Sequence, residues 1–157
     1  MAFSYPGSGH QALRRGRRSE SGRIYLVTTT THRREPHFSR WEAASRLSAV
    51  LATRSAWSPH AELLCWVLMP DHWHGLVRLT GGATLAHVVG AAKGRSAHAV
   101  RGVMAGRPVW ADGFHDRALR QDDDVLVAAR YIITNPVRAG LVSRLRDYPY
   151  WNAVWLD

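Results

Sequence analysis

His72 and His74 are the residues in this sequence whose types and spacing most directly suggest chemistry. One bulky residue, Trp73, separates them within a mostly apolar run from Trp66 to Val77. If this run forms a strand, alternation places both histidines on one face and Trp73 on the other. Two imidazoles on one face of a strand offer two nitrogen ligands to a metal ion. The alternatives are a chance pair in a chain with nine histidines, and a His-x-His-x-His phosphoryl-transfer motif, against which Leu76 counts.

Tyr131 and Asn135 form a second candidate pair, about sixty residues downstream. The acidic run 122–124 suits the first turn of a helix, and Pro136 disfavours helical geometry at Asn135, so we expect a helix over 122–135. Residues four apart lie on one face of a helix, so Tyr131 and Asn135 should lie together on its last turn. The alternative is a tyrosine that simply packs its ring and hydrogen-bonds its hydroxyl.

Four runs of residues, spread over almost the whole chain from about Ile24 to about Trp151, resemble the REP-associated tyrosine transposases. These proteins are single-tyrosine, HUH-type transposases and nucleases. The most specific part is Asn-Pro-Val-Arg-Ala-Gly-Leu-Val, which begins four residues after the tyrosine. In chain order the four runs are Thr29 to Phe38, Met69 to His74, Val109 to Arg120, and Tyr131 to Val142.

The resemblance implies a site and a reaction. His72, His74 and Asn135 would hold a divalent ion, and a neutral amide oxygen beside imidazoles suits Mg²⁺ or Mn²⁺. The Tyr131 hydroxyl would attack a DNA phosphodiester, forming a covalent 5′-phosphotyrosine and releasing a 3′-hydroxyl. Asp71 is either a partner that orients a ligand histidine or only a turn residue after Pro70.

The resemblance also implies the partners. The substrate would be single-stranded or hairpin DNA, acted on by a monomer or a homodimer, with no small-molecule cofactor. We therefore expect a DNA-nicking and strand-joining transposase. A catalytically silent DNA-binding module derived from a transposase is the alternative, and a phosphohydrolase that uses the two histidines without the tyrosine is a third possibility.

The charge of the chain favours a nucleic-acid partner. The net charge is +9 and the sequence pI about 10.9, carried almost wholly by arginine, although arginine bias can also reflect a GC-rich genome. Trp151 and Trp155 are candidates for stacking on exposed bases. The candidate phosphate contacts, each equally explicable as a solvated surface charge, are Arg14, Arg15, Arg17, Arg18, Lys93, Arg117, Arg120 and Arg138.

Length and composition predict one cytoplasmic domain. We expect a flexible basic arm over residues 1–22 and a single domain over 23–157, which is long enough for a real core. The sequence contains no apolar run of membrane-spanning length and no apolar signal core. The single cysteine, Cys65, excludes an internal disulfide and is expected to be buried.

The expected elements alternate in a split βαβ pattern. They predict an α+β, ferredoxin-like fold, in which helices pack on an antiparallel sheet and a C-terminal helix carries Tyr131. Trp41 belongs to the apolar stripe of the first helix, and residues after 135 are expected to form a tail. The expected strands cover 24–30, 62–68, 72–79 and part of 109–119, and the helices 40–54, 84–104 and 122–135.

Overall fold

A five-stranded antiparallel sheet forms the centre of the molecule, in a computed structural model that describes residues 19–120 and 123–156. The strand order across the sheet is β4-β1-β3-β2-β5. The first four strands have the order of the ferredoxin-like fold, so the predicted fold class is confirmed. The strands are β1 Ile24–Thr30, β2 Ala61–Met69, β3 His72–Leu79, β4 His115–Ala118 and β5 Trp151–Ala153.

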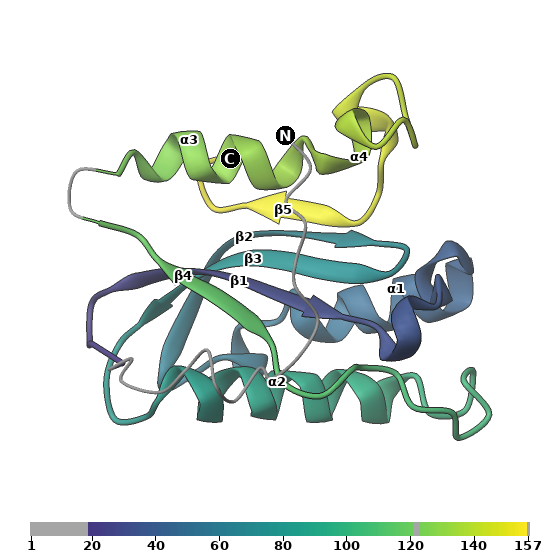
Figure 1. The fold of residues 1–157 in the computed structure, drawn as a ribbon, viewed down its shortest axis with the longest axis horizontal. Coiled ribbons are helices and arrows are strands. Elements are labelled where there is room, and N and C mark those ends of the chain that lie inside the picture. The colour runs from purple at the N-terminus through teal and green to yellow at the C-terminus, as the bar shows by residue number, and fades with distance from the viewer. Residues whose placement is uncertain (1–18, 121–122, 157) are drawn as a thin grey trace.

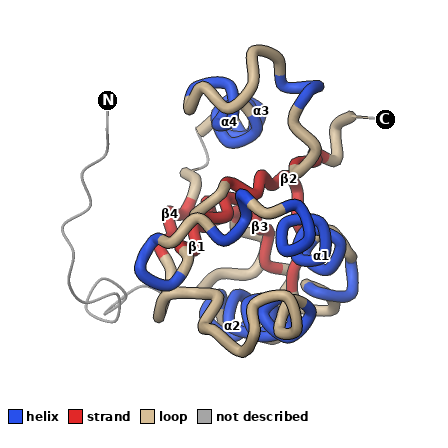
Figure 2. Tube along the Cα trace, turned by 90° about the vertical axis from the view of Figure 1, so that its right-hand side faces the viewer, coloured by secondary structure: helices blue, strands red, loops and turns tan. Residues whose placement is uncertain are grey.

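Helices cover both faces of this sheet (Figures 1 and 2). The helices α1, Trp41–Leu51, and α2, Leu85–Ala99, pack on one face. The helix α3, Val125–Ile133, packs on the other face and is followed by the short helix α4, Asn135–Arg138. Four 3₁₀ turns complete the structure: η2 His32–Arg34, η3 His37–Ser39, η4 Arg54–Ala56 and η5 Leu145–Asp147.

Alternation along β3 divides its side chains between two cores. Trp73 and Val77 point toward α1 and α2, into what we call the first core, where the Trp73 ring stacks on Trp57 at a centroid distance of 5.5 Å. Leu76 points the other way, into the second core, and packs with Ile132 of α3. A sheet covered on both faces needs apolar side chains on both sides, which explains why β2 and β3 are so rich in them.

Two expectations about the helices need correction. Trp41 is 72% exposed, because the inward stripe of α1 runs through Ala43, Ala44, Leu47 and Leu51 instead. The helix α2 is capped by the Thr84 hydroxyl as expected, but it ends at Ala99 and not near 104. A turn with positive φ at Ala105 and Gly106 follows, and it buries Met104 against the first core.

The expected tail is part of the sheet. β5 pairs with β2, with Cys65 opposite Ala153, and the Tyr148 hydroxyl donates a hydrogen bond to the Leu68 carbonyl. Trp151 is consequently half-buried against the second core, whereas Trp155 is 43% exposed. Cys65 is buried as predicted, and burial raises the pKa of its thiol to about 12.

Residues 19–22 of the predicted arm hydrogen-bond to the domain. The Leu85 amide donates to Ser19 Oγ at 2.9 Å, and the Gly22 amide donates to the Leu79 carbonyl at 2.7 Å. The rest of the arm, including Arg14, Arg15, Arg17 and Arg18, lies outside the described residues. Within the described part of the chain, no helix is both long and apolar enough to cross a bilayer.

Candidate metal and nucleophile site

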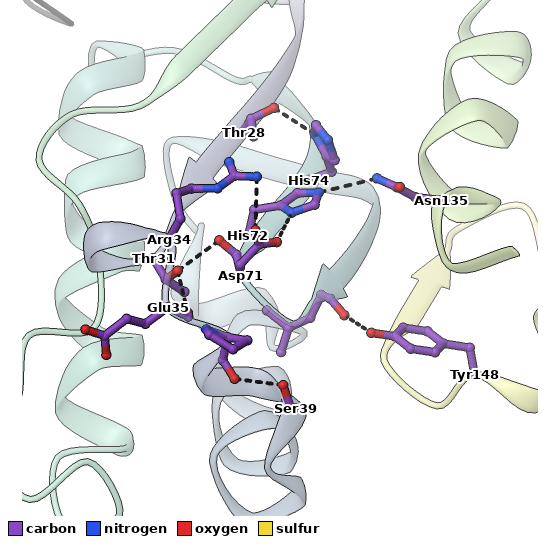
Figure 3. A network of polar contacts seen from close by, with 12 residues as sticks. Thr28, Thr31, Arg34, Glu35, Ser39, Asp71, His72, His74, Asn135 and Tyr148 are labelled. Atoms are coloured by element: carbon purple, nitrogen blue, oxygen red, sulfur yellow. Dashed lines mark hydrogen bonds and ion pairs between the residues drawn. The ribbon is translucent and has the colours of Figure 1, made fainter. Parts of the chain in front are cut away.

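The two histidines lie side by side at the start of β3, on the face that α3 covers (Figure 3). Their ring centroids are 4.8 Å apart and the rings are nearly perpendicular, at 88°. Trp73 between them is 2% exposed in the opposite core, as the alternation predicted. Since Trp73 is locked in place by packing, the strand cannot rotate without breaking that core.

Each histidine uses its Nδ1 atom for a hydrogen bond within the protein. His72 Nδ1 lies 2.7 Å from Asp71 Oδ1, and His74 Nδ1 lies 2.7 Å from the hydroxyl of Thr28, its cross-strand partner on β1. A carboxylate can only accept, so His72 carries its proton on Nδ1 when neutral. The Nε2 atoms of both rings are therefore the ones left for a ligand.

Asp71 orients His72 and is itself held in place. Its second oxygen, Oδ2, forms an ion pair of 3.0 Å with Arg34. The hydrogen bond from His72 is the main reason that the pKa of Asp71 is lowered, and the charge of Arg34 adds to this. Asp71 also stands in the turn between β2 and β3, so both of its predicted roles coexist.

His74 is neutral at physiological pH. Burial, with smaller contributions from the charges of His72 and Arg138, lowers its pKa to about 3. A neutral imidazole can bind a metal ion without first losing a proton.

Asn135 approaches the histidine pair from the helical segment that covers this face of the sheet. The helix α3 ends at Ile133, and Asn135 is the first residue of α4, so Asn135 stands at the junction of two helices. Its side-chain amide nitrogen lies 3.4 Å from His72 Nε2 (Figure 3). Turning the amide about its last side-chain bond would present its oxygen to the same place.

These donors fit a divalent ion. Two free imidazole nitrogens and one amide oxygen form a mixed set suited to Mg²⁺ or Mn²⁺. Among the described residues, no three His, Cys, Asp or Glu side chains cluster in a way that could hold a metal. A third protein ligand to an ion at the histidine pair would therefore be of another type, which the side-chain amide of Asn135 could supply.

Tyr131 lies on α3, one helical turn before Asn135, and is 49% exposed. Its ring therefore belongs to neither core. The Arg138 guanidinium carbon lies 4.0 Å from the ring centroid. The charge of Arg138 also contributes to the lowered pKa of His74.

The other candidate phosphate contacts within the described residues are Lys93, Arg117 and Arg120. Arg117 on β4 forms an exposed ion pair of 3.6 Å with Asp123, whose Oδ2 also accepts from the Arg120 amide. Lys93 donates hydrogen bonds to the carbonyls of Ala111 and Gly113 at 2.7 and 2.5 Å, and burial lowers its pKa. Lys93 thus ties α2 to the loop before β4.

Sequence reasoning missed two supporting residues, Thr28 and Arg34. Thr28 is an ordinary strand residue until the β1–β3 register places it opposite His74. Arg34 follows Arg33, and both have positive φ, at 56° and 55°. Such strained backbone at non-glycine residues clusters at functional sites, but no sequence signal reveals it here.

Comparisons with known proteins show the family and the fold of this chain. The family of IS200-like transposases matches residues 20–135. A REP-associated tyrosine transposase solved with a REP hairpin is similar at 21% identity and a TM-score of 0.66, over 86% of this chain and 79% of that one. A protein from Deinococcus radiodurans assigned as a transposase is similar at 22% identity and a TM-score of 0.54, over 73% and 92%. No curated protein matches the sequence.

Proposed function

This chain belongs to the family of IS200-like transposases, and from that premise we propose that it cuts and rejoins single-stranded or hairpin DNA through a covalent bond to Tyr131. His72, His74 and Asn135 would hold the divalent ion, Mg²⁺ or Mn²⁺. The observation that carries the proposal is the approach of Asn135 to within 3.4 Å of His72 Nε2, from a position 63 residues away. The structure solved with a REP hairpin supports a hairpin as the partner.

The reaction would begin with the Tyr131 hydroxyl. It loses its proton and its oxygen bonds to phosphorus, while the bond from phosphorus to the 3′ oxygen of the preceding nucleotide breaks. The products are a 5′-phosphotyrosine and a free 3′-hydroxyl. Attack of another 3′-hydroxyl on the phosphotyrosine reverses the step and joins new ends. A bound divalent ion would stabilise the negative charge that develops on the phosphate oxygens.

The protein side chains would supply orientation and charge. Asp71 and Thr28 fix the two imidazole rings through their Nδ1 atoms, so that the Nε2 atoms stay directed into the site. Arg138 lies over the Tyr131 ring, and its guanidinium would be available to a phosphate that the tyrosine attacks. Arg117 and Arg120, with exposed side chains at the other end of the sheet, are proposed contacts of the flanking DNA, as are the four arginines of the arm.

A covalent-adduct assay tests the proposal. The protein is incubated with a single-stranded DNA hairpin and Mg²⁺ or Mn²⁺ and run on a denaturing gel. We expect an adduct in the wild type and in a Tyr150→Phe control, and none in Tyr131→Phe. Cleavage that survives Tyr131→Phe would indicate a phosphohydrolase. A mobility shift on a native gel without cleavage in any protein would indicate the silent DNA-binding module.

A further inference from the structure

The side chains of Arg138 and Thr134 interact with each other beside Tyr131. The Arg138 guanidinium lies over the tyrosine ring, with its carbon 4.0 Å from the centroid. Its Nη1 donates a hydrogen bond of 2.6 Å to the Thr134 hydroxyl. That hydroxyl in turn donates to the Arg130 carbonyl at 2.7 Å. The guanidinium is thus held at two points, by a ring and by a hydroxyl.

The position of Thr134 explains why it can anchor Arg138. It is the C-cap of α3 and the residue before α4, with φ −84° and ψ 0°. Its hydroxyl therefore reaches the final turn of one helix and a side chain that leaves the next. The hydrogen bonds of the Thr134 hydroxyl thus join a backbone carbonyl of α3 to a side chain of α4.

Tyr131 needs such a restraint. Because its ring is half-exposed and is not among the buried residues of either core, packing restrains its rotamer only weakly. A nucleophile that samples several orientations attacks more slowly than one held near its target, and a misplacement of about 1 Å can cost a hundredfold in rate. A cation over an exposed ring attracts it electrostatically and so favours the rotamer in which the two stack.

We propose that Arg138, anchored by Thr134, is a positioning residue that holds the Tyr131 ring on the side of the helix that faces the histidine pair. This inference rests on the proposed role of Tyr131 as the nucleophile. It differs from a phosphate contact by Arg138, because a phosphate contact sets the affinity for DNA whereas positioning sets the rate of the covalent step.

Thr134 separates the two roles because it touches Arg138 without offering a charge to DNA. Thr134→Val keeps the shape and removes the hydroxyl, and Thr134→Ser restores the hydroxyl. Loss of the bond to the Arg130 carbonyl should not melt the helix, since such back-bonding by threonine is not a stabilising feature of helices. A thermal melt of each variant checks this.

The first test measures single-turnover adduct formation with saturating hairpin DNA and Mg²⁺. We expect Thr134→Val to lower the rate constant about tenfold, with unchanged hairpin affinity and an unchanged slope of affinity against salt. Thr134→Ser should restore the rate. The double variant Thr134→Val, Arg138→Gln should react no more slowly than Arg138→Gln alone, since both changes remove the same restraint on the Tyr131 ring.

A wild-type rate in Thr134→Val, a loss equal in Thr134→Ser, or rate losses that multiply in the double variant would each overturn the positioning role. Survival of the adduct in Tyr131→Phe would instead overturn the proposed function.

A second test does not depend on activity. Side-chain couplings of Tyr131 measured by NMR in the DNA-free protein should report one dominant χ1 rotamer in the wild type and an average over rotamers in Thr134→Val. An averaged rotamer in the wild type would refute the inference even if the enzyme proves inactive.

Discussion

Replacing Asp71 by asparagine should weaken metal binding at the histidine pair. Asp71 makes no expected contact with the ion, but it accepts the proton of His72 Nδ1 at 2.7 Å and so fixes which nitrogen faces the site. Asparagine keeps the size of the side chain and removes the negative charge. The Arg34 guanidinium, now 3.0 Å from a charged oxygen, would then lose its partner and leave an uncompensated positive charge nearby.

The size of the effect follows from these contacts. Loss of a partner that orients a ligand histidine typically costs about 10- to 100-fold in metal affinity, or about 1.4 to 2.7 kcal/mol. Asp71 is 30% exposed and Arg34 is 55% exposed, so water screens part of the charge change. We therefore expect the lower end of the range, about tenfold for Asp71→Asn.

Mn²⁺ binding can be measured without any DNA, by calorimetry or from the paramagnetic signal of the free ion. His72→Ala serves as the variant that removes a ligand outright. Glu62→Gln is the matched control, because Glu62 forms an ion pair of the same 3.0 Å length with Arg78 on the same hairpin. That pair lies about 20 Å along the strand from the β2 residue opposite His72.

The reasoning would be refuted if Asp71→Asn bound Mn²⁺ as tightly as the wild type while His72→Ala did not bind it. The histidine would then keep its orientation without the carboxylate. An equal loss in Glu62→Gln would show that the effect is one of overall charge and not of ligand orientation.

Three further predictions concern the scaffold. Gly75→Ala should lower the free energy of unfolding by about 1–3 kcal/mol in urea titrations, because a Cβ at Gly75 would come within 2.2 Å of the Trp73 ring; an unchanged midpoint would mean that the indole moves freely. Asp124→Ala should cost about 1 kcal/mol, since Asp124 Oδ1 accepts hydrogen bonds from two amides of the first turn of α3, and an Asp124→Asn variant should recover most of the loss. Cys65 should react with a thiol reagent at pH 8 only as fast as the protein opens, because burial raises its pKa to about 12; rapid labelling of the folded protein would contradict the buried position.

Local patterns in the sequence determined the elements. The alternation around Trp73 predicted that His72 and His74 share a face, because the side-chain period of a strand is a local property of the backbone. Thr84 as a helix cap is also a local effect, and the structure has it. The helix α3 likewise ends close to Pro136, but Pro136 itself lies in the first turn of α4. The order of strands and helices then restricted the fold to the ferredoxin-like class.

Features with weak local signals were harder to predict. β5 has only three residues, too few to display a period, and it exists because the edge of β2 offers unpaired backbone groups. Trp41 fitted the apolar spacing of α1, yet its exposure depends on where the helix begins relative to the sheet. Spacing alone does not contain that information.

Tertiary structure alone decided which groups support the site. The register of β1 against β3 brings Thr28 to His74, a strained turn brings Arg34 to Asp71, and the bend at Thr134 brings Arg138 onto Tyr131. Each of these contacts depends on the relative placement of separate elements, which is set by packing across the whole domain. Residue types and periodicity determine what each element can offer, whereas distances between elements follow only from the way in which the two cores close around the sheet.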